Sequence, residues 1–214
     1  VGADGPTHAG SFDTTYLTTL PNFIVMAASD EAELVRMINT STEINDRPCA
    51  FRYPRGTGLG SVLPSINEKI EIGKSKIIKE GKKLAILNFG ARLNETLKAA
   101  ENLLKKGVSI TVVDARFAKP LDENLIWQLA TTHEAIMTIE EGSIGGFGSH
   151  VVNFLTKKGL MDSNLKFRSL TLPDIFIDQD TPDKMYKVAN LDSVSIEEKV
   201  LDLLNSNIVL KKQN

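Results

Sequence analysis

The feature that most constrains this chain is a regular alternation of short apolar runs and amphipathic stretches in its second half. The apolar runs have the length of buried strands, and each is followed by apolar residues that recur at helical spacing. The runs cover residues 84–87, 108–113, 136–139 and 167–172, and two helices follow the last of them. Strands that alternate with helices in this way build a mainly parallel sheet with helices on both faces, so the predicted fold class is α/β.

The first part of the chain predicts one further strand–helix–strand unit. Residues 23–27 form a short apolar run suited to a buried parallel strand, and Ser29 is placed to cap the helix that follows. The next strand covers residues 49–53 and ends at Pro54, after which several glycines make an irregular exit loop.

These patterns predict three segments. Residues 1–61 form one unit and residues 62–80 a linker that ends in an edge strand near residues 76–78. Residues 81–214 form the second α/β unit. The string Glu80-Gly81-Lys82 resembles a hairpin turn into the next strand.

Composition excludes several classes of function. The formal net charge of −2 and the lack of a basic block with aromatic residues argue against nucleic acid as a partner. An apolar run of about 18 residues and a basic-then-apolar leader are both missing, so we expect neither a membrane partner nor a signal peptide. The single cysteine, Cys49, indicates a reducing, cytoplasmic location and, in its apolar surroundings, an inert thiol. Because the sequence opens at Val1 in a turn-rich string, we interpret the chain as a fragment.

The first candidate site is the loop Gly2-Ala3-Asp4-Gly5-Pro6-Thr7-His8. His8 exchanges a proton near neutral pH, and Asp4 is suited to orient it or to bind hydroxyl groups. On composition alone a structural interpretation is favoured about two to one, in which Asp4 caps a turn and His8 caps the helix around Tyr16.

The second candidate site is Arg52-Tyr53-Pro54-Arg55-Gly56, at the carboxyl end of a predicted strand. A guanidinium is a forked, permanent cation that matches phosphate oxygens. A solvated or salt-bridged arginine is an equally good interpretation. Strand alternation predicts that at most one of Arg52 and Arg55 reaches a given site, and it does not say which of them would hold a phosphate.

The third candidate is the glycine-rich turn at residues 140–148. Such a turn can cradle phosphate through backbone N–H groups, but the adjacent Glu140 and Glu141 would repel an anion. A structural or interdomain loop is therefore the favoured interpretation. The scattered histidines and the single cysteine predict no metal site in this chain.

Taken in order, several of these strings resemble the 1-deoxy-D-xylulose-5-phosphate synthase family of transketolase-like thiamine-diphosphate enzymes. The resemblance runs from residue 1 to about residue 204. It is carried by Gly2-Ala3-Asp4-Gly5-x-Thr7-His8-x-Gly10-x-Phe12-Asp13, Arg52-Tyr53-Pro54-Arg55-Gly56, Asp114-Ala115-Arg116-Phe117-x-Lys119-Pro120-Leu121-Asp122, Glu140-Glu141-Gly142-x-x-Gly145-Gly146-Phe147-Gly148-Ser149 and Leu172-Pro173-Asp174-x-Phe176-Ile177.

The resemblance implies part of a pyrimidine-binding domain followed by a transketolase C-terminal-type domain. It implies condensation of pyruvate with glyceraldehyde 3-phosphate, with loss of carbon dioxide, on thiamine diphosphate and magnesium in a homodimer. It also implies that His8 and Asp4 line the catalytic site and that Arg55 binds the acceptor's phosphate.

The family's cofactor-binding motifs are not found in this sequence, neither the pyrimidine-activating glutamate nor the Gly-Asp-Gly…Asn motif for diphosphate and magnesium. We therefore predict that this polypeptide alone neither holds the cofactor nor turns over, and that it works with the missing N-terminal part of the enzyme. Two alternatives stay open. One is a β-chain-like part of a pyruvate-type dehydrogenase, and the other is a non-catalytic assembly module.

Overall fold

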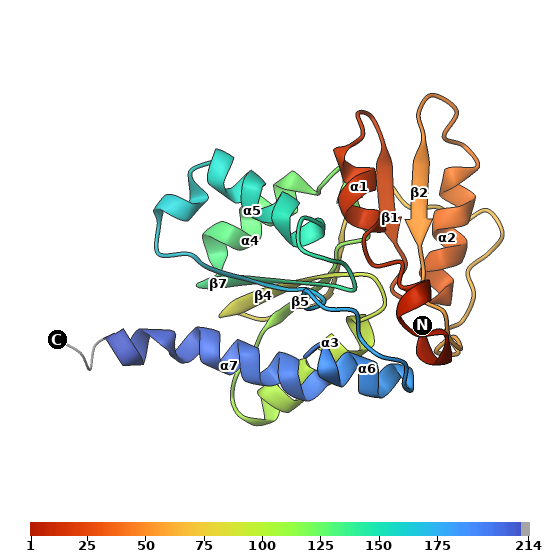
Figure 1. The fold of residues 1–214 in the computed structure, drawn as a ribbon. Coiled ribbons are helices and arrows are strands. Elements are labelled where there is room, and N and C mark those ends of the chain that lie inside the picture. The colour runs from red at the N-terminus through yellow and green to blue at the C-terminus, as the bar shows by residue number, and fades with distance from the viewer. Residues whose placement is uncertain (211–214) are drawn as a thin grey trace.

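The computed structural model describes residues 1–210, with side chains to residue 205, and contains two sheets (Figure 1). The smaller sheet has the order β2-β1-β6. Strand β1 (Ile24–Ala27) runs parallel to β2 (Cys49–Arg52) and antiparallel to β6 (Phe117–Lys119). The predicted second unit extends to residue 214, and its residues 211–214 lie outside the described part of the chain.

Two helices accompany the smaller sheet, α1 (Asp13–Thr19) and α2 (Glu31–Ser41). The prediction that Ser29 caps α2 is wrong. The Asp30 carboxylate accepts the Glu33 N–H at 2.7 Å and is the cap, which places two acidic residues in the first turn, where the helix dipole favours them. Ser29 is buried and donates its hydroxyl to Asp114 instead.

The larger sheet has the order β3-β5-β4-β7-β8. Its four parallel strands are β4 (Leu84–Phe89), β5 (Thr111–Asp114), β7 (Ala135–Glu140) and β8 (Lys166–Leu170). The edge strand β3 (Lys76–Lys79) lies antiparallel to β5, which confirms the predicted edge strand. The predicted hairpin at residues 80–82 is wrong, because β3 pairs with β5 and not with β4, the strand that follows it in sequence.

Helices cover both faces of the larger sheet, as predicted (Figure 1). Because side chains alternate along a strand, Ala85 and Leu87 of β4 face one side, and Leu84 and Ile86 face the other. The first side packs against α4 (Glu123–Thr132) and α5 (Phe147–Lys157), and the second against α3 (Leu93–Lys105) and α7 (Ser193–Leu210). The short helix α6 (Pro182–Val188) precedes α7. The α/β fold class is confirmed.

Strand β6 was not predicted, and it joins the two parts of the chain. It follows β5 of the larger sheet after only two residues, Ala115 and Arg116, yet it pairs with β1 of the smaller one. Its three residues stop before Pro120, too short a run to give a periodic signal. Lys119 donates to the backbone carbonyls of Thr18 and Leu20, which ties β6 to the end of α1. The two sheets are therefore fixed to each other by hydrogen bonds.

A buried charged cluster lies where the chain crosses between the sheets. The Asp114 carboxylate accepts the Ser29 hydroxyl at 2.6 Å, and it faces Glu33 and Arg116, which form an ion pair at 2.9 Å. Arg36 pairs with the same Glu33. Burial first, and the Glu33 charge in addition, raise the pKa of Asp114 from its ordinary 3.8 to about 7.

This raised pKa predicts a pH-dependent stability that Asp114→Asn removes. Between pH 4 and pH 7 the folded protein keeps a proton on Asp114 that the unfolded chain has released. Asp114 therefore contributes stability at low pH that is lost as pH rises towards 7, at about 1.4 kcal/mol per pH unit. We expect urea unfolding to show wild type losing stability relative to Asp114→Asn across this interval. A constant difference between the two proteins from pH 4 to pH 7 would contradict the assignment.

Cys49 is half-buried against the apolar cluster beneath α2, and burial raises the pKa of its thiol. This agrees with an unreactive cysteine. None of the helices in the described residues has the length and apolar character needed to cross a bilayer.

Candidate active site

A cavity of about 680 Å³ lies at the carboxyl ends of strands from both sheets. Its walls come from the N-terminal loop, the exit of β2, the loop after β7, and the segment from β8 into α6. The lining residues are 1, 5, 8–13, 52–55, 141, 143, 144, 172–177, 182, 185 and 186. Ligands of open α/β sheets bind at this end of the strands.

The N-terminal loop brings His8 to the cavity. It consists of two 3₁₀ turns, Gly2–Asp4 and Pro6–His8, joined by Gly5 at a φ of 65°, a left-handed conformation that glycine adopts without strain. The Nδ1 atom of His8 lies 3.0 Å from the Thr7 hydroxyl. Within the described residues Nε2 has no partner, and it is therefore open to a ligand. His8 does not cap α1, whose N-cap Phe12 makes no side-chain cap bond.

Asp4 and Arg55 come together at the edge of the same cavity. The Arg55 Nη1 lies 2.8 Å from the Asp4 carboxylate, and it also donates to the Val1 carbonyl at 2.8 Å. The Arg55 side chain is 62% exposed, so the guanidinium still has donors that face solvent. The loops of His8 and Arg55 therefore converge on one cavity, with Asp4 as the contact between them.

Arg52 lines the cavity as well, so the prediction that at most one arginine reaches it is wrong. Strand alternation fixes side-chain directions only within β2, which ends at Arg52, and Arg55 lies beyond it after Pro54. The two side chains differ in their surroundings. Arg52 is 20% exposed, and its Nε donates to the Asp13 carboxylate at 3.1 Å.

The loop between β7 and α5 holds no site for an anion. The buried Glu140 carboxylate accepts the N–H groups of Phe147 and Gly148 at 3.0 and 2.9 Å, and it thereby occupies the N-terminus of α5. Burial raises the pKa of Glu140, although these two bonds and Arg52 oppose the shift. The loop is also tied to the N-terminal part, because the Ser143 N–H donates to the Ser11 carbonyl at 3.0 Å. The interpretation as an interdomain loop is confirmed.

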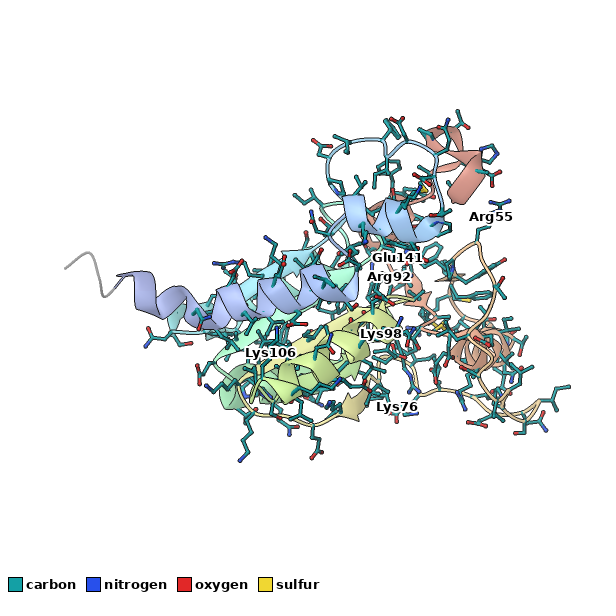
Figure 2. All side chains as sticks on the ribbon, turned by 90° about the horizontal axis from the view of Figure 1, so that it is seen from below. Arg55, Lys76, Arg92, Lys98, Lys106 and Glu141 are labelled. Atoms are coloured by element: carbon teal, nitrogen blue, oxygen red, sulfur yellow. The ribbon has the colours of Figure 1, made fainter. Side chains whose placement is uncertain are left out.

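A group of side chains that the sequence did not indicate forms the inner wall of the cavity. Glu141 pairs with Arg92 at 2.8 Å, and the Arg92 guanidinium lies 3.4 Å from the centre of the Tyr186 ring. Figure 2 shows Arg92 and Glu141 next to one another and Arg55 farther out. Burial, and then the Glu141 charge, raise the pKa of Tyr186. These residues are far apart in sequence and share no motif, so only the fold brings them together.

The described residues contain no group of three or more His, Cys, Asp or Glu side chains placed to hold a metal ion. A diphosphate bound through magnesium has no matching ligands in this part of the molecule. The cavity does offer His8, Asp4 and Arg55 to a ligand that another part of the enzyme holds.

Comparisons with known proteins agree with this architecture. Residues 1–58 match the transketolase pyrimidine-binding domain, and residues 73–196 match the transketolase C-terminal domain. A similar solved structure is a split gene transketolase, described as an inactive β4 tetramer. It superposes with a TM-score of 0.81 at 27% sequence identity, over 95% of this chain and 65% of that chain. The chain belongs to the transketolase family.

Proposed function

We propose that this chain is part of a 1-deoxy-D-xylulose-5-phosphate synthase, which condenses pyruvate with glyceraldehyde 3-phosphate and releases carbon dioxide. The observation that carries the proposal is the convergence of His8, Asp4 and Arg55 on one cavity. An imidazole and a guanidinium about a shared space suit an acceptor with a carbonyl group at one end and a phosphate at the other.

Arg55 binds the phosphate of the acceptor in this proposal. Its guanidinium is exposed, permanently charged and forked, and phosphate oxygens accept from such a group in pairs. In the described structure the Asp4 carboxylate occupies one of its nitrogens, which keeps the side chain at the cavity edge before the acceptor arrives.

His8 moves protons at the carbonyl and hydroxyl oxygens of the acceptor. Its Nε2 has no partner within residues 1–205, and its Nδ1 is held by Thr7. Asp4 is close enough to the same ligand to accept a hydroxyl group from it. Both residues act by hydrogen bonding, and neither has to form a covalent bond.

Thiamine diphosphate, when bound, supplies the carbanion chemistry that removes carbon dioxide from pyruvate. Because a three-ligand metal site is lacking among the described residues, we propose that the missing N-terminal part of the enzyme holds the diphosphate and magnesium. His8, Asp4 and Arg55 then face the cofactor's reacting end and do not anchor it.

Product analysis of the complete enzyme tests the proposal. We expect carbon dioxide release from pyruvate, supported by thiamine diphosphate and magnesium, to depend strongly on glyceraldehyde 3-phosphate. The product is a five-carbon 1-deoxy ketose phosphate, and light scattering should give the mass of a homodimer. Acyl transfer to lipoamide in place of this product would favour a pyruvate-type dehydrogenase instead.

Ketol transfer of the transketolase type is the second candidate, favoured by the likeness to the split gene transketolase. That reaction takes a two-carbon unit from a ketose phosphate and releases no carbon dioxide. A complete enzyme that transfers the unit from a ketose phosphate and leaves pyruvate untouched would replace the first proposal with this one.

A further inference from the structure

The exit of β2 directs two arginines to the cavity, Arg52 and Arg55, and only one of them has the surroundings of a phosphate ligand. We propose that Arg52 is a positioning residue that holds the His8 loop against the Arg55 loop and does not itself bind the acceptor. The inference rests on the proposed function for the identity of the acceptor, and on contacts within this chain for the rest.

The first contact is the ion pair between Arg52 and Asp13. The Arg52 Nε donates to Asp13 Oδ2 at 3.1 Å, while Asp13 Oδ1 accepts the Thr14 N–H at 2.8 Å at the start of α1. Both side chains are mostly buried, with 20% and 25% of their surfaces exposed. Asp13 follows His8 closely in sequence, and Arg52 closely precedes Arg55. The pair therefore fixes the spacing between the two loops.

A second carboxylate acts on the same guanidinium. Glu140, 1% exposed at the end of β7, lies close enough for Arg52 to lower its pKa and for Asp13 to raise it. Both Glu140 oxygens already accept N–H groups of α5. Glu140 also sits tightly beneath the loop backbone, because a Cβ added to Gly146 would lie 2.3 Å from its Oε2. Arg52 thus links the N-terminal loops to the C-terminal domain.

These neighbours make Arg52 a poor phosphate ligand. A phosphate at Arg52 would approach two carboxylates, Asp13 and Glu140, which repel it in a largely buried setting. Arg55 pairs with Asp4 alone and is 62% exposed, so an incoming phosphate has less repulsion to overcome there. The division of labour follows from the charges and the burial of the two side chains.

Kinetics of the complete enzyme with Arg52→Gln, Asp13→Asn and the double variant test this proposal. Loss of the joint misplaces both loops, so each single variant should lower kcat and raise the acceptor KM together, by about tenfold each. The double variant should be no worse than either single one, because the two residues act through one contact. Arg52→Lys, which keeps the charge, should recover part of the activity.

A phosphate ligand would behave differently. If Arg52 bound the acceptor, Arg52→Gln would raise the acceptor KM with kcat unchanged, and Asp13→Asn would free the guanidinium and lower that KM. This pattern overturns the proposal. Arg55→Ala, made in the same enzyme, reports separately on the proposed function.

Amide hydrogen exchange gives a readout that does not depend on the substrate. We expect residues 8–12 and 53–56 to exchange at least about fivefold faster in both Arg52→Gln and Asp13→Asn, because the joint restrains both loops. Exchange in α3, which lies away from the joint, serves as the control for global unfolding. Unchanged exchange in the two loops would overturn the proposal even if the enzyme acted on another substrate.

Discussion

Replacing Arg55 by alanine is expected to raise the complete enzyme's KM for glyceraldehyde 3-phosphate far more than its KM for pyruvate. The change removes a charge-assisted hydrogen bond to phosphate, which is worth roughly 1.5–3 kcal/mol. Since 1.4 kcal/mol corresponds to a factor of ten, the acceptor KM should rise by roughly 10- to 150-fold. Steady-state kinetics with each substrate varied in turn measures both constants.

The chain offers a matched control for this variant. Arg47 is also exposed, and it pairs with Asp46 at 2.5 Å, but it does not line the cavity. Arg47→Ala should leave both Michaelis constants unchanged, because exposed ion pairs contribute little. An Arg55→Ala enzyme with an unchanged acceptor constant would reject the assignment of Arg55 as the phosphate ligand.

Phe89→Ala is expected to cause the largest loss of stability, about 3–5 kcal/mol. Phe89 is fully buried at the end of β4, and its ring stacks on that of Phe147 at a centroid distance of 5.1 Å. Removing the ring leaves a cavity where α5 begins, next to the N–H groups that bind Glu140. The free energy of unfolding, from urea titrations followed by circular dichroism, measures the effect.

Phe176→Ala is the control, because the same residue type occupies a different environment. Its ring is 65% exposed and meets Phe12 edge to face at 6.1 Å. We expect a loss below about 1 kcal/mol, since little apolar surface leaves contact with the protein. If the two variants lost equal stability, the buried stack would not be the centre of the core.

The regular elements were predictable because their signals are local. The apolar strands of the larger sheet and the helical stripe of α3 satisfy their backbone hydrogen bonds through short, periodic patterns. The partners of the edge elements were not predictable in this way. Strand β3 pairs with β5 and strand β6 with β1, and a short strand carries no sequence signal for which edge it will join.

The site divides along the same line. His8, Asp4 and Arg55 were predicted because a histidine and an arginine in glycine- and proline-shaped loops at strand ends point to ligand binding, and the fold brings them to one cavity. Asp13 was part of a quoted motif but had no predicted role, because its partner Arg52 is distant in sequence. The wall of Glu141, Arg92 and Tyr186 had no signal in the sequence.

The sequence by itself determined the α/β class, the order of the strands and helices along the chain, and the residue types available for chemistry, because these depend on local propensity and periodicity. The tertiary structure alone decided which arginine is held between carboxylates and which is open to a ligand. That choice depends on burial and on charges that residues far apart in sequence bring together, such as Asp13 and Glu140 about Arg52.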